Sequence, residues 1–163
     1  MGAGVVVVTG RGSVDAHKLA LARSLGADRT VDVEADDAVD AVMAVTGGRG
    51  ADVVVDTTPH AAAPLRDAVA MVRPGGTIVL AGLKGPEGVD GFPVDAVAMK
   101  AVTLRGVRAV DPASLRRAIA LLEADRPALD AFHTHHFGLE QAARAVECLG
   151  SPEVRAVAVT VEA

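Results

Sequence analysis

The sequence contains almost no aromatic residues, and this determines what its core is made of. Among 163 residues there are three phenylalanines, no tryptophan and no tyrosine, although half of the chain is hydrophobic. Valine, alanine and leucine must therefore fill the interior, which is typical of buried parallel strands flanked by alanine-rich helices. With 23% charged residues at this length, the composition predicts one globular domain with a substantial core.

Other absences exclude whole classes of protein. The single cysteine, Cys148, rules out an internal disulfide and a multi-cysteine zinc site within one chain, in agreement with a cytoplasmic location. No apolar run approaches the roughly 20 residues of a membrane span, and the start Met-Gly-Ala-Gly lacks the basic region of a signal peptide. A formal net charge of −5 gives no reason to expect nucleic acid. We therefore expect neither a membrane nor a nucleic-acid partner.

Short apolar runs alternate with helical patterns along the chain, which predicts βαβ units and a mostly parallel sheet with flanking helices. The fold class expected is thus α/β and Rossmann-like. The expected strands cover residues 5–8, 30–33, 51–55, 77–81, 102–107 and 154–161, with a further segment over 132–137. Helices are expected between these segments, including one that starts at Asp111-Pro112 and one over about 139–149. The exception is the interval between the strands 77–81 and 102–107, where residues 84–93 indicate a loop and no helix is expected.

The glycine-rich phosphate loop of a dinucleotide-binding fold is missing. Such a fold runs from its first strand into G-x-G-x-x-G and a helix, whose N–H groups take the pyrophosphate. The turn after residues 5–8 reads Thr-Gly-Arg-Gly-Ser and does not fit. The glycines at 2–4 and 47–50 both precede strands, so we interpret them as an irregular N-terminus and a helix cap. Without a G-x-S-x-G elbow or any tyrosine, the chain indicates a binding scaffold and offers no clear reaction centre.

A histidine cluster invites a metal-site interpretation. His133 and His135, in the run His-Thr-His-His, would share a face of a strand. No paired carboxylate or cysteine spacing accompanies them, as a metal site would need. We therefore interpret the cluster as a solvated rim and predict no metal ligands in this chain.

Two strand ends carry the most information about a ligand. Asp56-Thr57-Thr58 follows the strand 51–55, and Ala81-Gly82-Leu83 ends the strand 77–81. The carboxyl ends of parallel strands are where open α/β sheets bind ligands. Asp56 could equally cap the turn that follows it, and the sequence leaves both interpretations open.

Six phrases in this order and spacing resemble the nucleotide-binding half and C-terminus of the medium-chain, zinc-type alcohol dehydrogenases. They are RSLGADRTVDV, TGGRGADVVVDTT, VRPGGTIVLAGLKG, VTLRGVRA, THHFGLEQAARAVECL and VRAVAVTV. The resemblance covers almost the whole chain. It implies NAD(P)-dependent hydride transfer between nicotinamide and an alcohol or a carbonyl compound.

The resemblance also accounts for the missing glycine loop. In the family, the segment that corresponds to residues 5–28 is the second strand and helix of the Rossmann domain. The first strand, the glycine-rich loop and the zinc-bearing catalytic lobe would therefore lie upstream. We therefore expect residues 1–163 to be a single, partial Rossmann-type domain with a C-terminal extension, truncated at its N-terminus and inactive alone. It would have no catalytic residues and no zinc ligands of its own.

The alternative is a non-catalytic module that binds a nucleotide weakly or acts by self-association. A methyltransferase is a more distant possibility, since it too would need a glycine loop. Because loss of the family's first strand would leave sheet edges exposed, we expect a homodimer or a higher oligomer. The family pairs subunits through the strand like 102–107; alternatively, the last strand could fill the vacant position.

The resemblance implies cofactor contacts at several positions of this sequence. The adenosine ribose would meet the turn after residues 5–8, and the adenine would meet the end of the strand 51–55, where Pro59 departs from a common glycine. The nicotinamide would face backbone after two later strands, and an arginine fork would pair with the pyrophosphate unless it is only a solvated charge. In that order the residues are Thr9, Gly10, Arg11, Ser13 and Lys18; Thr57 and Thr58; Ala81, Gly82, Leu83, Val107 and Arg108; and Arg155.

The turn also predicts the choice between NAD and NADP. NAD-selective members place an acid at the end of the second strand, which accepts hydrogen bonds from the ribose and repels a 2′-phosphate. This sequence has Gly10 there, followed by Arg11. The nearest acid, Asp15, is better explained as a residue that caps the start of the helix. We therefore expect Arg11, Ser13 and Lys18 to admit NADP at least as well as NAD.

Overall fold

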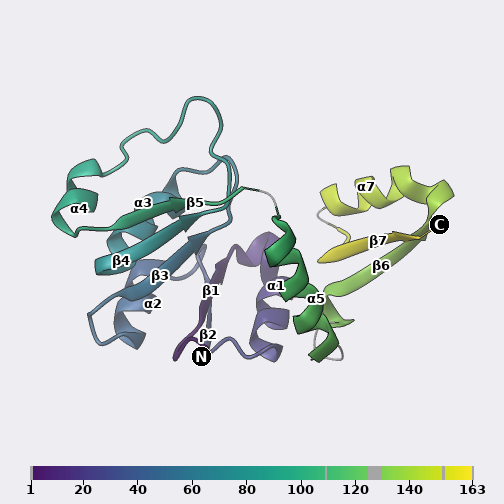
Figure 1. Cartoon of the computed structure of the whole chain (residues 1–163), viewed down its shortest axis with the longest axis horizontal. Coiled ribbons are helices and arrows are strands. Elements are labelled where there is room, and N and C mark those ends of the chain that lie inside the picture. The colour runs from purple at the N-terminus through teal and green to yellow at the C-terminus, as the bar shows by residue number, and fades with distance from the viewer. Residues whose placement is uncertain (1, 109, 125–129, 152, 163) are drawn as a thin grey trace. The chain divides into compact units, whose positions relative to one another are not determined.

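The computed structural model describes residues 2–108, 110–124, 130–151 and 153–162. The chain divides into two compact units, one made of Met1–Glu34 with Val110–Ala163 and the other of Ala35–Ala109. The described strands form three small sheets, β1-β2, β3-β4-β5 and β6-β7, and every pairing is parallel (Figure 1). Parallel sheets with flanking helices confirm the predicted α/β class.

The unit Ala35–Ala109 contains the three-stranded sheet. Its strands are β3 (Ala51–Asp56), β4 (Val72–Leu80) and β5 (Thr103–Gly106), and its helices are α2 (Ala38–Val45), α3 (Ala63–Met71) and α4 (Val94–Met99). Figure 1 shows the three strands side by side, with the short α4 beyond the long loop that follows β4. Because the strands are parallel, their carboxyl ends lie at one edge of the sheet.

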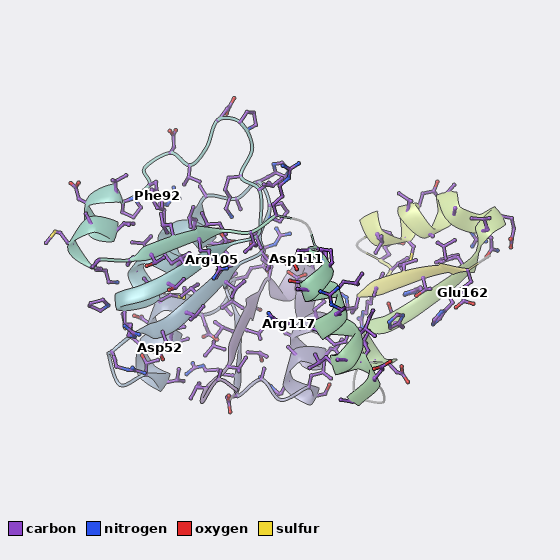
Figure 2. The ribbon with its side chains drawn as sticks, in the orientation of Figure 1. Asp52, Phe92, Arg105, Asp111, Arg117 and Glu162 are labelled. Carbon is purple, nitrogen blue, oxygen red and sulfur yellow. The ribbon has the colours of Figure 1, made fainter. Side chains whose placement is uncertain are left out.

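The core of this unit lies between α3 and one face of the sheet. Leu65, Ala68 and Val69 recur at helical spacing on α3 and pack with Val72 and Ile78, all buried. Phe92, labelled in Figure 2 on the loop before α4, packs against this cluster, as do side chains of α4. The opposite face of the sheet differs, since Val53 and Val55 on β3 are 55% and 58% exposed.

Two features of this unit depart from the sequence-based expectation. β4 begins at Val72, whereas we expected this strand to start at residue 77. The extra length is accommodated by a register irregularity opposite residues 51–53 of β3, and Gly75 N donates to Lys100 O instead of to the ladder. Helix α4 was not predicted, because six apolar-rich residues without a side-chain cap carry no helical signature.

The other unit holds the two-stranded sheets. β1 (Val7–Gly10), α1 (Gly12–Ser24) and β2 (Arg29–Asp32) form a βαβ segment, and β6 (His133–Gly138), η2 (Leu139–Gln141), α7 (Ala142–Gly150) and β7 (Ala158–Glu162) form the second. Between them lie α5 (Pro112–Ala124) and η1 (Asp130–Phe132). Asp111, labelled in Figure 2 at the start of α5, accepts hydrogen bonds from Ala113 N and Ser114 N. This cap confirms the predicted start of the helix.

Two strands of this unit are shorter or later than predicted. β1 extends to Gly10 because its ladder with β2 pairs Gly10 with Asp32, so Thr9 and Gly10 lie in the strand and not in the turn. β7 begins at Ala158 instead of at residue 154. Here the Thr134 hydroxyl accepts from Val157 N and donates to Ala158 O, which replaces ladder bonds at a bulge in β6. Among the described residues, no helix is both long enough and apolar enough to cross a membrane.

Candidate functional site

Two loops meet at the carboxyl ends of β3 and β4. We call residues 57–60 the β3 loop and residues 81–84 the β4 loop. Ala81 N and Gly82 N both donate to the carbonyl oxygen of Asp56 at 2.9 Å, and His60 N donates to Leu83 O at 2.9 Å. The strand ends predicted to form a site are thus side by side, whereas their contacts with a cofactor stay a prediction.

Gly82 is where the two loops approach most closely. A Cβ added to this glycine would lie 2.4 Å from Thr58 O, 2.6 Å from Thr58 C and 2.7 Å from Thr57 C. All three atoms belong to the main chain of the β3 loop, so no side-chain rotation could make room. The close packing of these loops therefore requires glycine at this position.

Asp56 and Lys84 form a buried ion pair beneath the loops. Asp56 Oδ1 accepts from Thr58 N at 2.9 Å, which confirms that Asp56 caps the turn after β3. Asp56 Oδ2 lies 2.7 Å from Lys84 Nζ, and the two side chains are 2% and 11% exposed. Lys84 Nζ also donates to Thr58 O at 2.5 Å. Sequence reasoning missed Lys84, because no pattern along the chain links it to Asp56.

His60 closes the β3 loop in an unusual backbone conformation. Its φ of 54° lies in the left-handed region that residues other than glycine seldom adopt. The hydrogen bond from His60 N to Leu83 O holds it there. Such strained backbone persists where surrounding contacts determine it, and it is common at ligand-binding sites.

The end of β5 lies at the same edge of the sheet. Val107 N donates to Leu80 O at 3.1 Å, which extends the parallel ladder past Gly106. The side chains of Val107 and Arg108 are exposed. The three strand ends predicted to face a dinucleotide in this unit are therefore adjacent in the sheet.

The turn between β1 and α1 is surrounded by carboxylates. Gly12 N donates to Asp32 Oδ1, while Ser13 N and Ser13 Oγ donate to the two oxygens of Glu34, each bond being 2.7 Å long. A Cβ on Gly12 would lie only 1.9 Å from Asp32 Oδ2. Sequence reasoning identified neither Asp32 nor Glu34, which belong to β2 and the residues just after it.

Asp15 accepts two further contacts beside this turn. Arg11 N donates to Asp15 Oδ2 at 3.2 Å, and Lys18 Nζ lies 3.0 Å from Asp15 Oδ1. The helix-start interpretation of Asp15 is thus confirmed. Partial burial acts to raise the pKa of Asp15, but the hydrogen bonds from Lys18 and from the Arg11 N–H outweigh it, so the pKa lies below its usual value.

The histidine cluster and Arg155 lie outside both loops. The bulge in β6 separates His133 from His135, and it is His133 and His136 whose rings stack, with centroids 6.2 Å apart. The expectation that His133 and His135 share a face is therefore wrong. In the described parts of the chain, no three His, Cys, Asp or Glu side chains are grouped to hold a metal ion, so those residues do not fit zinc. Arg155 is exposed and precedes β7, so it is not part of that strand.

Comparison with known proteins agrees with this arrangement. A family model described as zinc-binding dehydrogenase matches residues 1–124. A probable alcohol dehydrogenase of Mycobacterium tuberculosis is 48% identical over 126 residues, which cover 77% of this chain and 34% of that protein. The L-threonine 3-dehydrogenase of Bacillus subtilis is 30% identical over 137 residues, covering 83% of this chain and 39% of the relative. The chain thus spans little more than a third of the length of these relatives.

Solved structures give the same answer for the fold. An alcohol dehydrogenase from Thermotoga maritima superposes with a TM-score of 0.85 and 26% identity, over 99% of this chain and 44% of that one. The alcohol dehydrogenase TADH from Thermus sp. ATN1 gives a TM-score of 0.83 and 29% identity, over 97% and 44% of the two chains. These matches and the parallel strand order identify the architecture as the Rossmann-like part of such enzymes.

Proposed function

Because the chain belongs to the zinc-binding dehydrogenase family, we propose that it forms the dinucleotide-binding part of an NAD(P)-dependent oxidoreductase. When bound, the nicotinamide ring would accept or donate the hydride that moves to or from an alcohol or a carbonyl compound. The observation that carries the proposal is the meeting of the β3 and β4 loops at the carboxyl ends of parallel strands.

Each group of residues would have a separate role in holding the dinucleotide. Exposed Thr57 and Thr58 would contact the adenine, and the backbone at residues 81–83 and 107–108 would face the nicotinamide. The turn at residues 9–13, with Lys18, would meet the ribose, and the exposed Arg155 guanidinium would reach the pyrophosphate. The chain's own contribution is to bind and orient the cofactor.

We propose further that residues 1–163 act as one partial Rossmann-type domain that requires another lobe for turnover. Two facts support this: the chain spans about a third of its relatives, and its described residues group no metal ligands. The purified chain should bind NADH weakly, detected by the fluorescence of the reduced nicotinamide, without oxidising an alcohol. Zinc-dependent turnover by the pure chain would overturn the inactivity, and the absence of any NADH binding at millimolar concentration would overturn the proposed function.

The finer proposal is that the turn accepts NADP at least as well as NAD. Arg11, Ser13 and Lys18 offer donors that would suit a 2′-phosphate. In the structure, however, the Ser13 donors are taken by Glu34 and the Lys18 ammonium by Asp15. A phosphate would therefore have to displace the Glu34 carboxylate from Ser13, which makes Glu34 a competitor for the site.

A second candidate is a module that acts by self-association, and one specific observation favours it. Val53 and Val55 leave an apolar face of β3 more than half exposed, and among the described strands β1 pairs only with β2 and β3 only with β4. Exposed edges of this kind recruit further strands. We propose a cytoplasmic homodimer or higher oligomer, and light scattering at micromolar concentration tests it, since a monodisperse monomer would contradict it.

A further inference from the structure

One ammonium group connects the two loops of the proposed site. Lys84 Nζ lies 2.7 Å from Asp56 Oδ2 at the end of β3 and donates to Thr58 O at 2.5 Å, although Lys84 itself belongs to the β4 loop. We propose that Lys84 is a positioning residue, which holds the β3 loop against the β4 loop so that both face the dinucleotide. The identity of the ligand rests on the proposed function, whereas the contacts of Lys84 with the β3 loop do not.

The charge of Lys84 is needed because of where Asp56 lies. The Asp56 side chain is 2% exposed, and only its Oδ1 receives a hydrogen bond from the turn. Without the ammonium, Oδ2 would be a buried carboxylate oxygen with no partner among the described residues, which is strongly unfavourable. The pair also cancels a negative charge at the strand ends, where a dinucleotide, itself an anion, would bind.

The other contacts between the loops hold different atoms. The carbonyl oxygen of Asp56 accepts hydrogen bonds from Ala81 N and Gly82 N, which fixes the beginning of the β4 loop. His60 N bonds Leu83 O, which fixes the end of the β3 loop. Among the described hydrogen bonds, the carbonyl of Thr58, midway along the β3 loop, is held by Lys84 alone. Lys84 therefore determines the position of the residue proposed to contact adenine.

The same unit provides a matched control. Lys100 Nζ donates to Val69 O at 2.7 Å and to Ala70 O at 2.9 Å, so it too binds two groups from a partly buried position. These carbonyls belong to α3 and are not part of either loop. Lys84→Met and Lys100→Met each remove one ammonium and two contacts, but only the first change should affect the proposed site.

The first experiment needs no ligand. Amide hydrogen exchange measured by NMR on the full chain should show Thr58 and His60 exchanging about tenfold faster in Lys84→Met than in the wild type or in Lys100→Met, because their loop loses a charge-assisted anchor. If Lys84→Met fails to fold, Asp56→Asn with Lys84→Met removes the buried carboxylate while still releasing Thr58 O. Equal exchange of these two amides in the Lys84 and Lys100 variants would overturn the inference.

The second experiment measures the Kd for NADH by fluorescence titration. We expect Lys84→Met to weaken binding by up to about tenfold, because the dinucleotide must then order a loop that has lost one charge-assisted anchor. Lys100→Met should leave the affinity nearly unchanged. Equal affinities for the Lys84 and Lys100 variants would overturn the positioning role. If the wild type itself does not bind NADH, the proposed function fails, whereas the exchange rates still decide whether Lys84 joins the loops.

Discussion

Replacing Gly82 with alanine should destabilise the protein by forcing the β3 and β4 loops apart. The new Cβ would lie 2.4 Å from Thr58 O, whereas ordinary contacts are about 3.5 Å, so the loops must separate by about 1 Å. Overpacking of this kind typically reduces stability by about 1–3 kcal/mol. The separation would also weaken the bonds that Asp56 O and Leu83 O accept, each worth about 1 kcal/mol. We expect a total loss of about 2–4 kcal/mol.

Gly106→Ala is the matched control for this experiment. Gly106 lies at the end of β5, its φ is not in the left-handed region, and an added Cβ would meet nothing within 4 Å. Its substitution should change the free energy of unfolding by less than about 0.5 kcal/mol. Urea unfolding measures the free energy of unfolding of both variants. In thermal unfolding, Gly82→Ala should lower the Tm by roughly 4–16 °C. If both variants unfold at the same urea concentration, the loops do not pack as closely as described.

Three further predictions concern other parts of the chain. In a complete protein that carries this turn, Arg11→Ala should weaken NADP about tenfold while barely changing NAD, as loss of a charge-assisted contact implies; equal losses, or a wild-type preference for NAD, would contradict the proposed phosphate site. The changes Val53→Thr and Val55→Thr together should shift the chain towards monomer in sedimentation, since they remove the apolar exposed face; an unchanged distribution would exclude this face as the interface. Hydrogen bonds from the Ser114 side chain and from the amides of Ser114 and Ala113 hold the pKa of Asp111 below its usual value. The contribution of Asp111 to folding stability is therefore present above the unfolded pKa of about 3.9 and is lost as the pH falls through the lower folded value. The amide resonances of Ala113 and Ser114 should therefore shift only at acidic pH below the ordinary range, and shifts centred at the ordinary value would contradict the cap.

The sequence predicted the elements that show as a local pattern of apolar residues. The apolar run predicted as a strand at residues 51–55 is β3, and the helix expected between the strands 51–55 and 77–81 is α3, whose buried face carries Leu65, Ala68 and Val69. Boundaries that depend on a partner strand could not be predicted in this way. The end of β1 at Gly10 and the late start of β7 at Ala158 follow from pairings with residues more than 20 positions away.

The candidate site was predictable to the same extent. Parallel strands place their carboxyl ends together, so the meeting of Thr58 and Gly82 could be expected from the order of the elements. The charged partners could not be expected. Lys84 reaches Asp56, and Glu34 reaches Ser13, only because separate elements bring them together, and nothing in the local sequence specifies those contacts.

Whether the β3 and β4 loops bind the dinucleotide can be decided by a single NMR titration. The chain, labelled with nitrogen-15, would be titrated with NADH to millimolar concentration, and the amide shifts assigned residue by residue. We expect the largest shifts on Thr58, Ala81, Gly82 and Leu83, and smaller ones at Val107. Shifts confined to β6 and β7, or none at the two loops, would contradict it.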